Sequence, residues 1–177
     1  FSHWKERGVT VYVGANDGML HAIKAGSFHE GDNPATLKEE HGWYEATENP
    51  ATPGGLGYER WAFIPGNLLP HLKWLTDPDY THVYYVDLKP KVTDVRIFND
   101  DANHPNGWGT ILIGGMRLGG GPYTVNEDFD NDGSIEGDEG DPGGKTNPWT
   151  FRSAYFVLDI TVPNNPVFLG EFTNPDL

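Results

Sequence analysis

The sequence contains no cysteine and has few basic residues. Without Cys, the chain forms no disulfide, has no thiolate nucleophile and offers no Cys ligand for zinc or an iron–sulfur cluster. Only 12 Lys and Arg stand against 26 Asp and Glu, which gives a formal net charge of −14 at pH 7. Duplex affinity comes largely from Lys and Arg on phosphates, so this balance argues against a nucleic-acid-binding protein.

Long apolar runs and the common catalytic motifs are also missing. No apolar run approaches the length of the apolar helix of a signal peptide or of a membrane span. None of the Ser residues lies in a Gly-x-Ser-x-Gly elbow, which argues against a serine hydrolase. The Gly-rich stretch 114–121 matches neither the P-loop nor the dinucleotide-binding pattern. We interpret that stretch as a turn where strands pack closely.

The chain is rich in glycine, proline and aromatic residues. Its 177 residues include 23 Gly, 14 Pro, 6 Trp, 8 Tyr and 9 Phe. Disordered chains are rarely so aromatic, and helical bundles are rarely so rich in Gly and Pro. The length suits one domain or part of a larger one. Because the chain begins Phe-Ser-His-Trp without Met, we expect an internal piece or a processed product.

The acidic residues are concentrated in two segments. Residues 126–141 hold eight acids and no base, and residues 26–58 hold six acids against Lys38 alone. The other 128 residues carry 12 acids and 11 bases, a net charge of −1. The pattern indicates a nearly neutral scaffold with two acidic insertions, and functional residues are most often found in such insertions.

The scaffold segments have the pattern of short β-strands. Residues 9–14 are rich in β-branched and aromatic side chains, Asn16-Asp17-Gly18 supplies turn chemistry, and 19–23 resumes the strand, which predicts a hairpin. A short helix is expected from Asn67, with Leu68, Leu72 and Leu75 on one face. Sandwiches, barrels and propellers all fit this pattern. Further strands are expected at 59–64, 81–88, 91–98, 110–114, 122–125, 153–160 and 167–172.

Four stretches carry a more specific similarity. Residues 11–23 (VYVGANDGMLHAI) resemble the blade hairpin of quinoprotein-like β-propellers. Together with ERWAFIPGNLLPHL (59–72), TILIGGMRLGGG (110–121) and YFVLDIT (155–161), they resemble the C-terminal propeller of the PilC/PilY family. The resemblance implies an all-β fold, a partial quinoprotein-like β-propeller of two to three blades with one short helix. The whole of 1–177 would be one propeller fragment, with insertion 26–58 as a rim loop and insertion 126–149 as a calcium-type loop.

The same resemblance implies a biological setting. Members of that family are large secreted proteins of type IV pilus assembly, associated with the pilus tip and with adhesion. It therefore implies a non-enzymatic protein at the cell surface or pilus tip, exported through the periplasm. Minor pilins would be its partners, together with a host or surface ligand. It implies no nucleic-acid partner, and no membrane span is expected in this chain.

The most specific ligand-binding motif lies in the second insertion. DFDNDGSIEGDE (128–139) matches the twelve-residue EF-hand calcium loop at each diagnostic position, with Gly133 at the sharp turn. Calcium prefers six to eight hard oxygen ligands, which carboxylates on alternate residues of a tight turn supply. Gly140-Asp-Pro-Gly-Gly144 follows where an EF-hand would begin its exiting helix. The predicted ligands of Ca²⁺ are Asp128, Asp130, Asp132, Ser134, Glu136 and Glu139.

Several alternatives stay open at this point. Residues 128–139 can also be interpreted as a solvated acidic loop. The first insertion contains possible zinc or iron ligands without the usual spacing, so a polar surface loop is the favoured interpretation. A quinoprotein-type dehydrogenase shares the propeller motif, and a purely structural secreted calcium-binding module is a further alternative. The possible ligands in the first insertion are His29, Glu30, Asp32, Glu39, Glu40 and His41.

Overall fold

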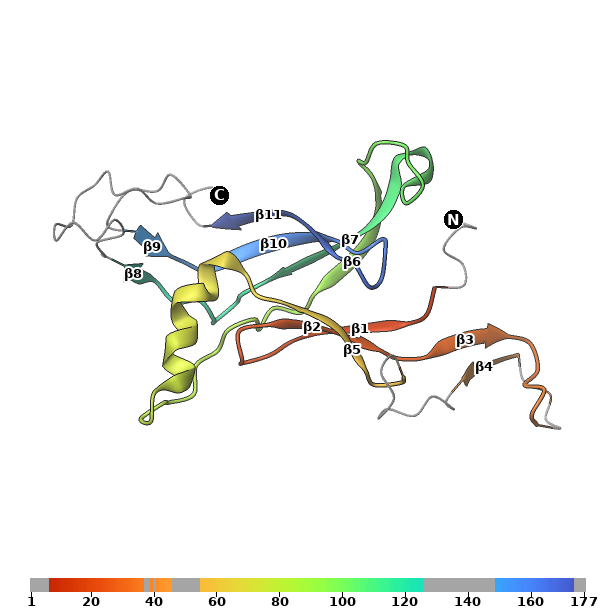
Figure 1. Ribbon diagram of the computed structural model, residues 1–177, viewed down its shortest axis with the longest axis horizontal. Coiled ribbons are helices and arrows are strands. Elements are labelled where there is room, and N and C mark those ends of the chain that lie inside the picture. Colours follow the sequence, from red (N-terminus) through yellow and green to blue (C-terminus); the bar gives the residue numbers. More distant parts are fainter. Residues whose placement is uncertain (1–6, 37–38, 40, 46–54, 126–148, 174–177) are drawn as a thin grey trace.

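The protein is built almost entirely from short antiparallel strands (Figure 1). The computed structural model describes residues 7–36, 39, 41–45, 55–125 and 149–173. Within this part, the longer of two 3₁₀ helices is η2 (Gly66–Thr76) and the shorter is η3 (Pro105–Gly107). The strands are β1 (Thr10–Gly14), β2 (Leu20–Lys24), β3 (Ser27–Glu30), β4 (Gly42–Glu45), β5 (Glu59–Phe63), β6 (Lys91–Arg96), β7 (Trp108–Gly115), β8 (Tyr123–Val125), β9 (Trp149–Phe151), β10 (Ala154–Asp159) and β11 (Val167–Thr173).

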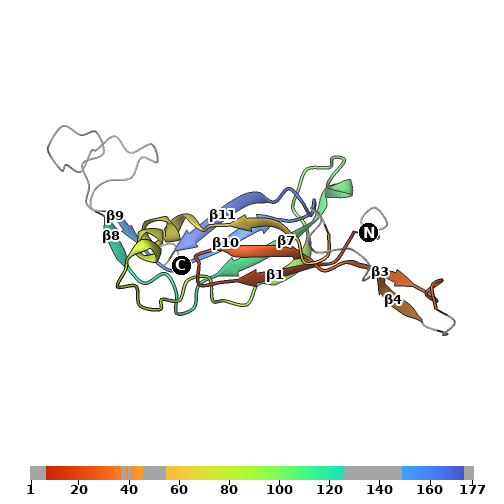
Figure 2. The ribbon, with the colours of Figure 1, turned by 60° about the horizontal axis from the view of Figure 1, so that its bottom comes forward.

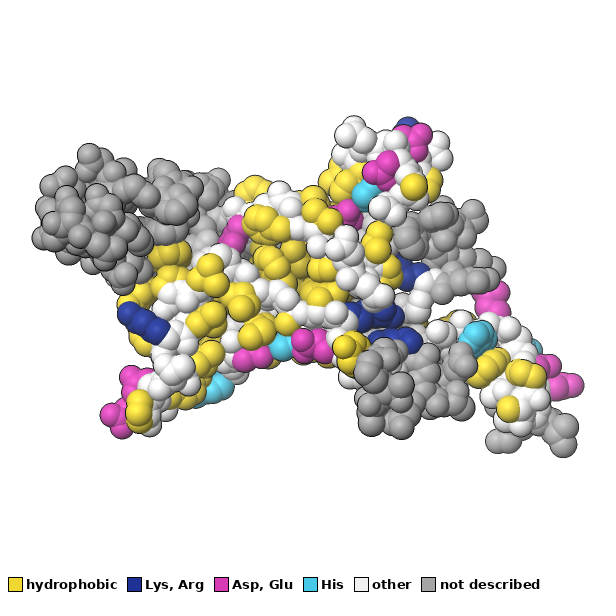
Figure 3. Space-filling view, viewed as in Figure 1, with side chains coloured by type: hydrophobic (Ala, Val, Ile, Leu, Met, Phe, Trp, Pro, Cys, Tyr) yellow, Lys and Arg dark blue, Asp and Glu magenta, His cyan; other side chains and the backbone are white. Residues whose placement is uncertain are grey.

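Two sheets pack face to face and enclose the hydrophobic core. One has the strand order β1-β2-β5, and the other has the order β11-β10-β7-β6. Leu20 from the first sheet and Leu112, Phe156 and Leu158 from the second are buried in one cluster. The ring of Phe63 on β5 lies 5.1 Å from that of Phe156 on β10. Figure 3 shows hydrophobic side chains gathered over the middle of the molecule, where these sheets lie.

The predicted first hairpin is confirmed. β1 and β2 pair from Thr10↔Lys24 to Gly14↔Leu20. At the turn, the Asp17 carboxylate accepts a hydrogen bond of 3.0 Å from the Met19 amide, and Gly18 adopts φ +90°. Turn residues that tolerate positive φ join two strands of alternating character, which is why the local sequence sufficed for this prediction.

The predicted strand at 81–88 is wrong. Among the described residues, this segment joins no strand ladder, yet Tyr85 and Val86 are fully buried. The chain passes so close to Gly14 and Gly119 that a Cβ at Gly14 would overlap the Val86 carbonyl, and one at Gly119 would overlap the Tyr85 carbonyl. Its β-branched and aromatic residues therefore fill the core from an extended, unpaired segment, which a strand-like pattern cannot distinguish from a strand.

The all-β class is confirmed, and the expected short helix is present as the 3₁₀ helix η2, which contains Pro70. A propeller is not confirmed, because none of the sheets formed by the described residues is closed. The acidic segment 26–58 contains a two-stranded ribbon, β3–β4, which extends away from the two packed sheets (Figures 1 and 2). No helix in the described part is both long and apolar enough to cross a membrane.

The close approach at Gly119 gives a testable expectation. Gly119→Ala forces the loop away from the Tyr85 backbone, and overpacking of this kind costs about 1–3 kcal/mol of unfolding free energy. Gly121→Ala is the matched control in the same loop, because no heavy atom lies within 4 Å of the Cβ position. We expect that control to stay within about 0.5 kcal/mol of wild type in urea denaturation. Equal effects of the two substitutions would contradict the packing described.

Candidate functional site

All six predicted calcium ligands, Asp128, Asp130, Asp132, Ser134, Glu136 and Glu139, lie outside the described residues. The structure does describe both flanks of the segment that contains them. β8 and β9 pair from Tyr123↔Phe151 to Val125↔Trp149. The hydroxyls of Thr124 and Thr150 are 3.0 Å apart across this pair. The two ends of the acidic segment are therefore held side by side, as the closure of a compact ligand loop requires.

The base of this segment rests on η2. The Tyr123 ring on β8 lies 5.3 Å from Trp74 and 5.5 Å from His71. Lys73 places Nζ 4.8 Å from the centre of the same ring, within the range of a cation–π contact. Burial lowers the pKa of His71, and its two buried ring nitrogens have no hydrogen-bond partner in the part of the chain that the structure describes. Side chains of η2 thus pack against β8, one of the two strands that flank the acidic insertion.

Glu171 binds the N-terminal end of η2. Its carboxylate accepts hydrogen bonds from the Gly66 amide at 2.8 Å, the Asn67 amide at 3.1 Å and Asn67 Nδ2 at 2.8 Å. A helix N-terminus has unpaired amides and a partial positive charge, so a carboxylate is a favourable partner there. In turn, Asn67 Oδ1 accepts a hydrogen bond of 3.2 Å from the Arg152 amide, just beyond β9.

The carboxylate of Asp87 accepts hydrogen bonds from backbone amides of the Gly-rich loop. The amides of Arg117, Leu118 and Gly119 donate to its carboxylate at 2.6, 2.8 and 3.3 Å. Burial alone would raise the pKa of Asp87, but the hydrogen bonds from these amides outweigh it and hold the pKa below its usual value. This carboxylate fills the position that an anion would take in such a nest of amides. The loop is therefore a structural turn, in agreement with the sequence interpretation.

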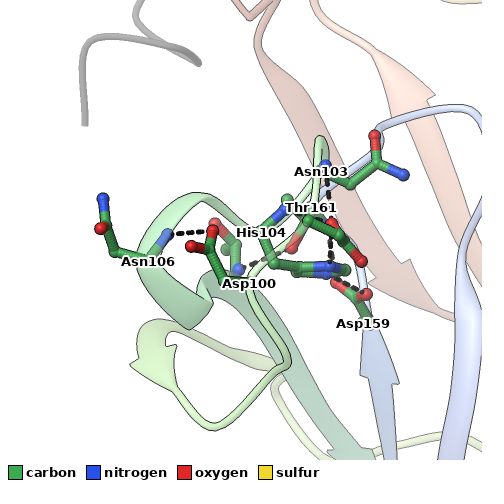
Figure 4. A network of polar contacts seen from close by, with 8 residues as sticks. Asp100, Asn103, His104, Asn106, Asp159 and Thr161 are labelled. Carbon is green, nitrogen blue, oxygen red and sulfur yellow. Dashed lines mark hydrogen bonds and ion pairs between the residues drawn. The ribbon is translucent and has the colours of Figure 1, made fainter.

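His104 joins the loop before β7 to the end of β10 (Figure 4). Its Nε2 lies 2.8 Å from Asp159 Oδ2, and its Nδ1 lies 3.1 Å from Asp101 Oδ1. Asp101 also accepts a hydrogen bond of 2.7 Å from the His104 amide, and Asp159 accepts one of 2.9 Å from the Thr161 amide. Burial opposes the charged imidazole, but the two carboxylates outweigh this effect and raise the pKa of His104.

A second histidine is held in the same way on the other sheet. His21 Nε2 lies 2.9 Å from Asp17 Oδ2, and its Nδ1 lies 2.9 Å from Glu59 Oε2. Here too burial opposes the charge, while Glu59 and Asp17 raise the pKa of His21 above its usual value. These histidines and carboxylates fasten strands and turns to one another, because each lies between two elements of the scaffold.

The first insertion offers no assembled metal centre in the part that the structure describes. There, no group of three or more His, Asp or Glu side chains is placed to hold an ion. Glu40 lies outside the described residues. The aromatic ring of His29 stacks on that of Trp43 across the β3–β4 ribbon, with ring centres 4.5 Å apart.

Sequence reasoning missed Asp87, Glu171 and the His104–Asp159 contact. The partners of these groups lie 30 to 105 positions away along the chain. A single sequence contains no local signal for such distant pairs. What it could have indicated is that the Gly-rich stretch 114–121 and the Pro65-Gly66-Asn67 turn contain backbone amides that need an acceptor.

The two-carboxylate site of His104 predicts a pH-dependent contribution to stability. A His whose pKa is raised on folding stabilises the protein fully below its unfolded pKa of about 6.5 and loses that effect as pH rises through the folded pKa. We compare urea unfolding of wild type and His104→Gln between pH 5.5 and 9. The difference in unfolding free energy should be largest at pH 5.5 and shrink toward pH 9, since His21 and His71 are common to both proteins. If the difference in unfolding free energy between the two proteins is constant with pH, a charged His104 does not stabilise the fold.

Curated relatives share a common description. Over 167 residues, 94% of this chain and 8% of the relative, the chain is 33% identical to a type IV pilus biogenesis factor PilY1 homolog of Xylella fastidiosa strain Temecula1. A second PilY1 homolog of that strain is 32% identical over 126 residues, 66% of this chain and 6% of the relative. PilY1 of Pseudomonas aeruginosa PAO1 is 33% identical over 119 residues, 66% of this chain and 7% of the relative.

No protein-family model and no solved structure gives a significant match. The chain spans only 6–8% of the length of the PilY1 relatives that it matches. The similarity nevertheless runs through nearly the whole of the 177 residues in one of them, and it recurs in proteins of two genera. These 177 residues belong to the PilY1-type family of type IV pilus biogenesis factors.

Proposed function

We propose that this chain is a calcium-binding, non-enzymatic segment of a protein that acts in type IV pilus biogenesis. The observation that carries the proposal is the 33% identity over 94% of the chain to a PilY1 homolog described as a pilus biogenesis factor. The scaffold carboxylates described above bind backbone amides or histidines of the fold, so the acidic insertions are the places where ligand chemistry is expected.

The calcium part of the proposal rests on the donor set and on its attachment. Five carboxylates and one backbone carbonyl at EF-hand spacing form a hard-oxygen set that suits Ca²⁺ and suits softer metals poorly. The paired strands β8 and β9 hold the two ends of the segment together. When bound, Ca²⁺ would neutralise carboxylates that otherwise repel one another. Loops of this kind in extracellular modules have dissociation constants of about 10⁻⁴–10⁻³ M.

Membership of the PilY1-type family supports the proposed setting and partners. We propose export through the periplasm to the cell surface or pilus tip, with minor pilins as partners and a role in surface adhesion. An acidic insertion ordered by calcium would bind a partner at a lower entropic cost than a flexible one.

The arrangement of sheets supports a propeller within the larger protein. β6, β7, β10 and β11 form a four-stranded antiparallel sheet, as in a propeller blade, and the sheet β1-β2-β5 packs on its face as a neighbouring blade would. We propose that the two sheets are consecutive blades.

Calcium-loop variants test both parts of the proposal. In calorimetric titration of the calcium-free chain, we expect one binding event that Asp128→Ala and Glu139→Ala abolish. Asp141→Ala is the matched control, because it removes an acid from the same segment but outside residues 128–139. No heat with wild type, or equal heat in all four proteins, would remove the calcium site.

The pilus role is tested by counting surface pili on cells from which the gene for this protein has been deleted. The deletion should abolish or strongly reduce surface pili, and the wild-type gene should restore them. The Asp128→Ala/Glu139→Ala gene should restore fewer pili than the Asp141→Ala gene at millimolar calcium. Normal piliation in the deletion strain would contradict the pilus role even if the calorimetry shows calcium binding.

A further inference from the structure

His71 is buried among aromatic rings, and both of its ring nitrogens are unpaired. The residue lies on η2 and is 2% exposed. The ring centres of Trp74, Tyr123 and Tyr85 lie 5.2, 5.5 and 6.0 Å from the centre of the imidazole. Neither Nδ1 nor Nε2 has a hydrogen-bond partner in the part of the chain that the structure describes. A buried polar group without a partner costs stability, and an apolar side chain at this position would avoid that cost.

The groups that face His71 do not balance a positive charge. From η2 the charged neighbour is Lys73, whose Nζ lies over the Tyr123 ring. From β8 and from the unpaired segment before β6 come the phenols of Tyr123 and Tyr85, and the Tyr85 hydroxyl donates a hydrogen bond of 3.4 Å to the His71 carbonyl. β9 contains no ionisable side chain, and none of the described carboxylates pairs with His71. An imidazolium here would be a buried charge without a counter-ion, which is strongly unfavourable.

Two other histidines of the scaffold respond to acid in the opposite direction. His21 and His104 each lie between two carboxylates, which raise the pKa of both groups. Burial without a carboxylate lowers the pKa of His71. As pH falls, the contacts of a histidine whose pKa is raised by folding become stronger, and those of a histidine whose pKa is lowered become weaker. Acid therefore strengthens the two sheets at His21 and His104 and weakens the packing around His71.

The packing around His71 joins η2 to the β8–β9 ribbon. The two strands lie beside η2, at one end of the packed sheets (Figures 1 and 2). Each strand has three residues, and a two-stranded ribbon of this size is at best marginally stable alone. The position of the ribbon therefore depends on its contact with η2, which Tyr123 makes with His71 and Trp74. The two packed sheets have longer strand ladders and a core of their own.

We propose that the contact between η2 and the β8–β9 ribbon is pH-sensitive: protonation of His71 opens it while the two packed sheets stay folded. In the open form the imidazole reaches water and takes up its proton with an ordinary pKa of about 6.5. Below that pH the population of the open form rises about tenfold per pH unit, until the closed form itself takes up the proton. Opening separates the two flanks of the acidic insertion from η2. The inference requires neither calcium binding nor a propeller nor the pilus role.

Amide hydrogen exchange, measured by mass spectrometry on the full-length polypeptide in calcium-free buffer, tests the proposal. Exchange rates are converted to protection factors, which removes the intrinsic dependence of exchange on pH. Between pH 7.5 and pH 5.5 we expect the protection of the β8 and β9 amides to fall about tenfold, whereas that of β7 and β10 does not fall.

Two variants remove the titrating group, and a third is the matched control. His71→Leu should keep the protection of β8 and β9 constant between pH 7.5 and pH 5.5. His71→Gln, which also carries no titrating group in this range, provides the same comparison where the leucine variant fails to fold. His82→Gln removes an exposed histidine from the segment before β6 and should show the same fall as wild type.

Three results would overturn the proposal. Constant protection of β8 and β9 in wild type would show that acid does not open the contact, whether or not the His71 variants fold. A tenfold fall in His71→Leu or His71→Gln, or the loss of the fall in His82→Gln, would assign the opening to another group. An equal fall in β7 and β10 would show that acid unfolds the sheets together with the ribbon.

Discussion

The arrangement of the candidate site depends on the carboxylate of Glu171. From β11, near the end of the described chain, it accepts hydrogen bonds from the first amides of η2. The same helix carries Trp74, whose ring contacts that of Tyr123 on β8. It also carries Asn67, whose side chain accepts a hydrogen bond from the Arg152 amide just beyond β9. One partly buried interaction between a carboxylate and a helix end therefore links β11, the helix η2 and the two strands that flank the acidic insertion.

Acidic residues have two distinct roles in this chain. Within the scaffold, Asp87 and Glu171 bind backbone amides, and Asp159 binds His104. In each case the charge is matched by donors of the fold, so these carboxylates stabilise the structure and are not free for a ligand. The excess of negative charge lies instead in the insertions 26–58 and 126–141. This division explains how a protein with a net charge of −14 forms an apolar core while its sequence concentrates acidic residues in two insertions.

The sequence predicts elements that depend on near neighbours and fails for those that depend on distant ones. The hairpin β1–β2 follows from alternation around Asn16-Asp17-Gly18, and most other strands lie where they were expected. The segment 81–88 has strand composition, but Gly14 and Gly119, far from it in the sequence, decide that it passes through the core unpaired. The role of Glu171 also depends on distant residues, since its hydrogen-bond partners lie 104 and 105 positions away in the sequence. The calcium ligands were predicted by spacing alone and remain a prediction, because they lie outside the described residues.

Amide hydrogen exchange in Glu171→Gln tests the account most directly, because it reports on the helix end that the carboxylate binds. The account predicts that the Gly66 and Asn67 amides exchange about tenfold or more faster than in wild type, since hydrogen bonds to a charged acceptor contribute about 1.5–3 kcal/mol. Asp79→Asn, which removes an exposed carboxylate beyond the other end of η2, should leave these two amides unchanged. Unaltered exchange at Gly66 and Asn67 in Glu171→Gln would contradict the account.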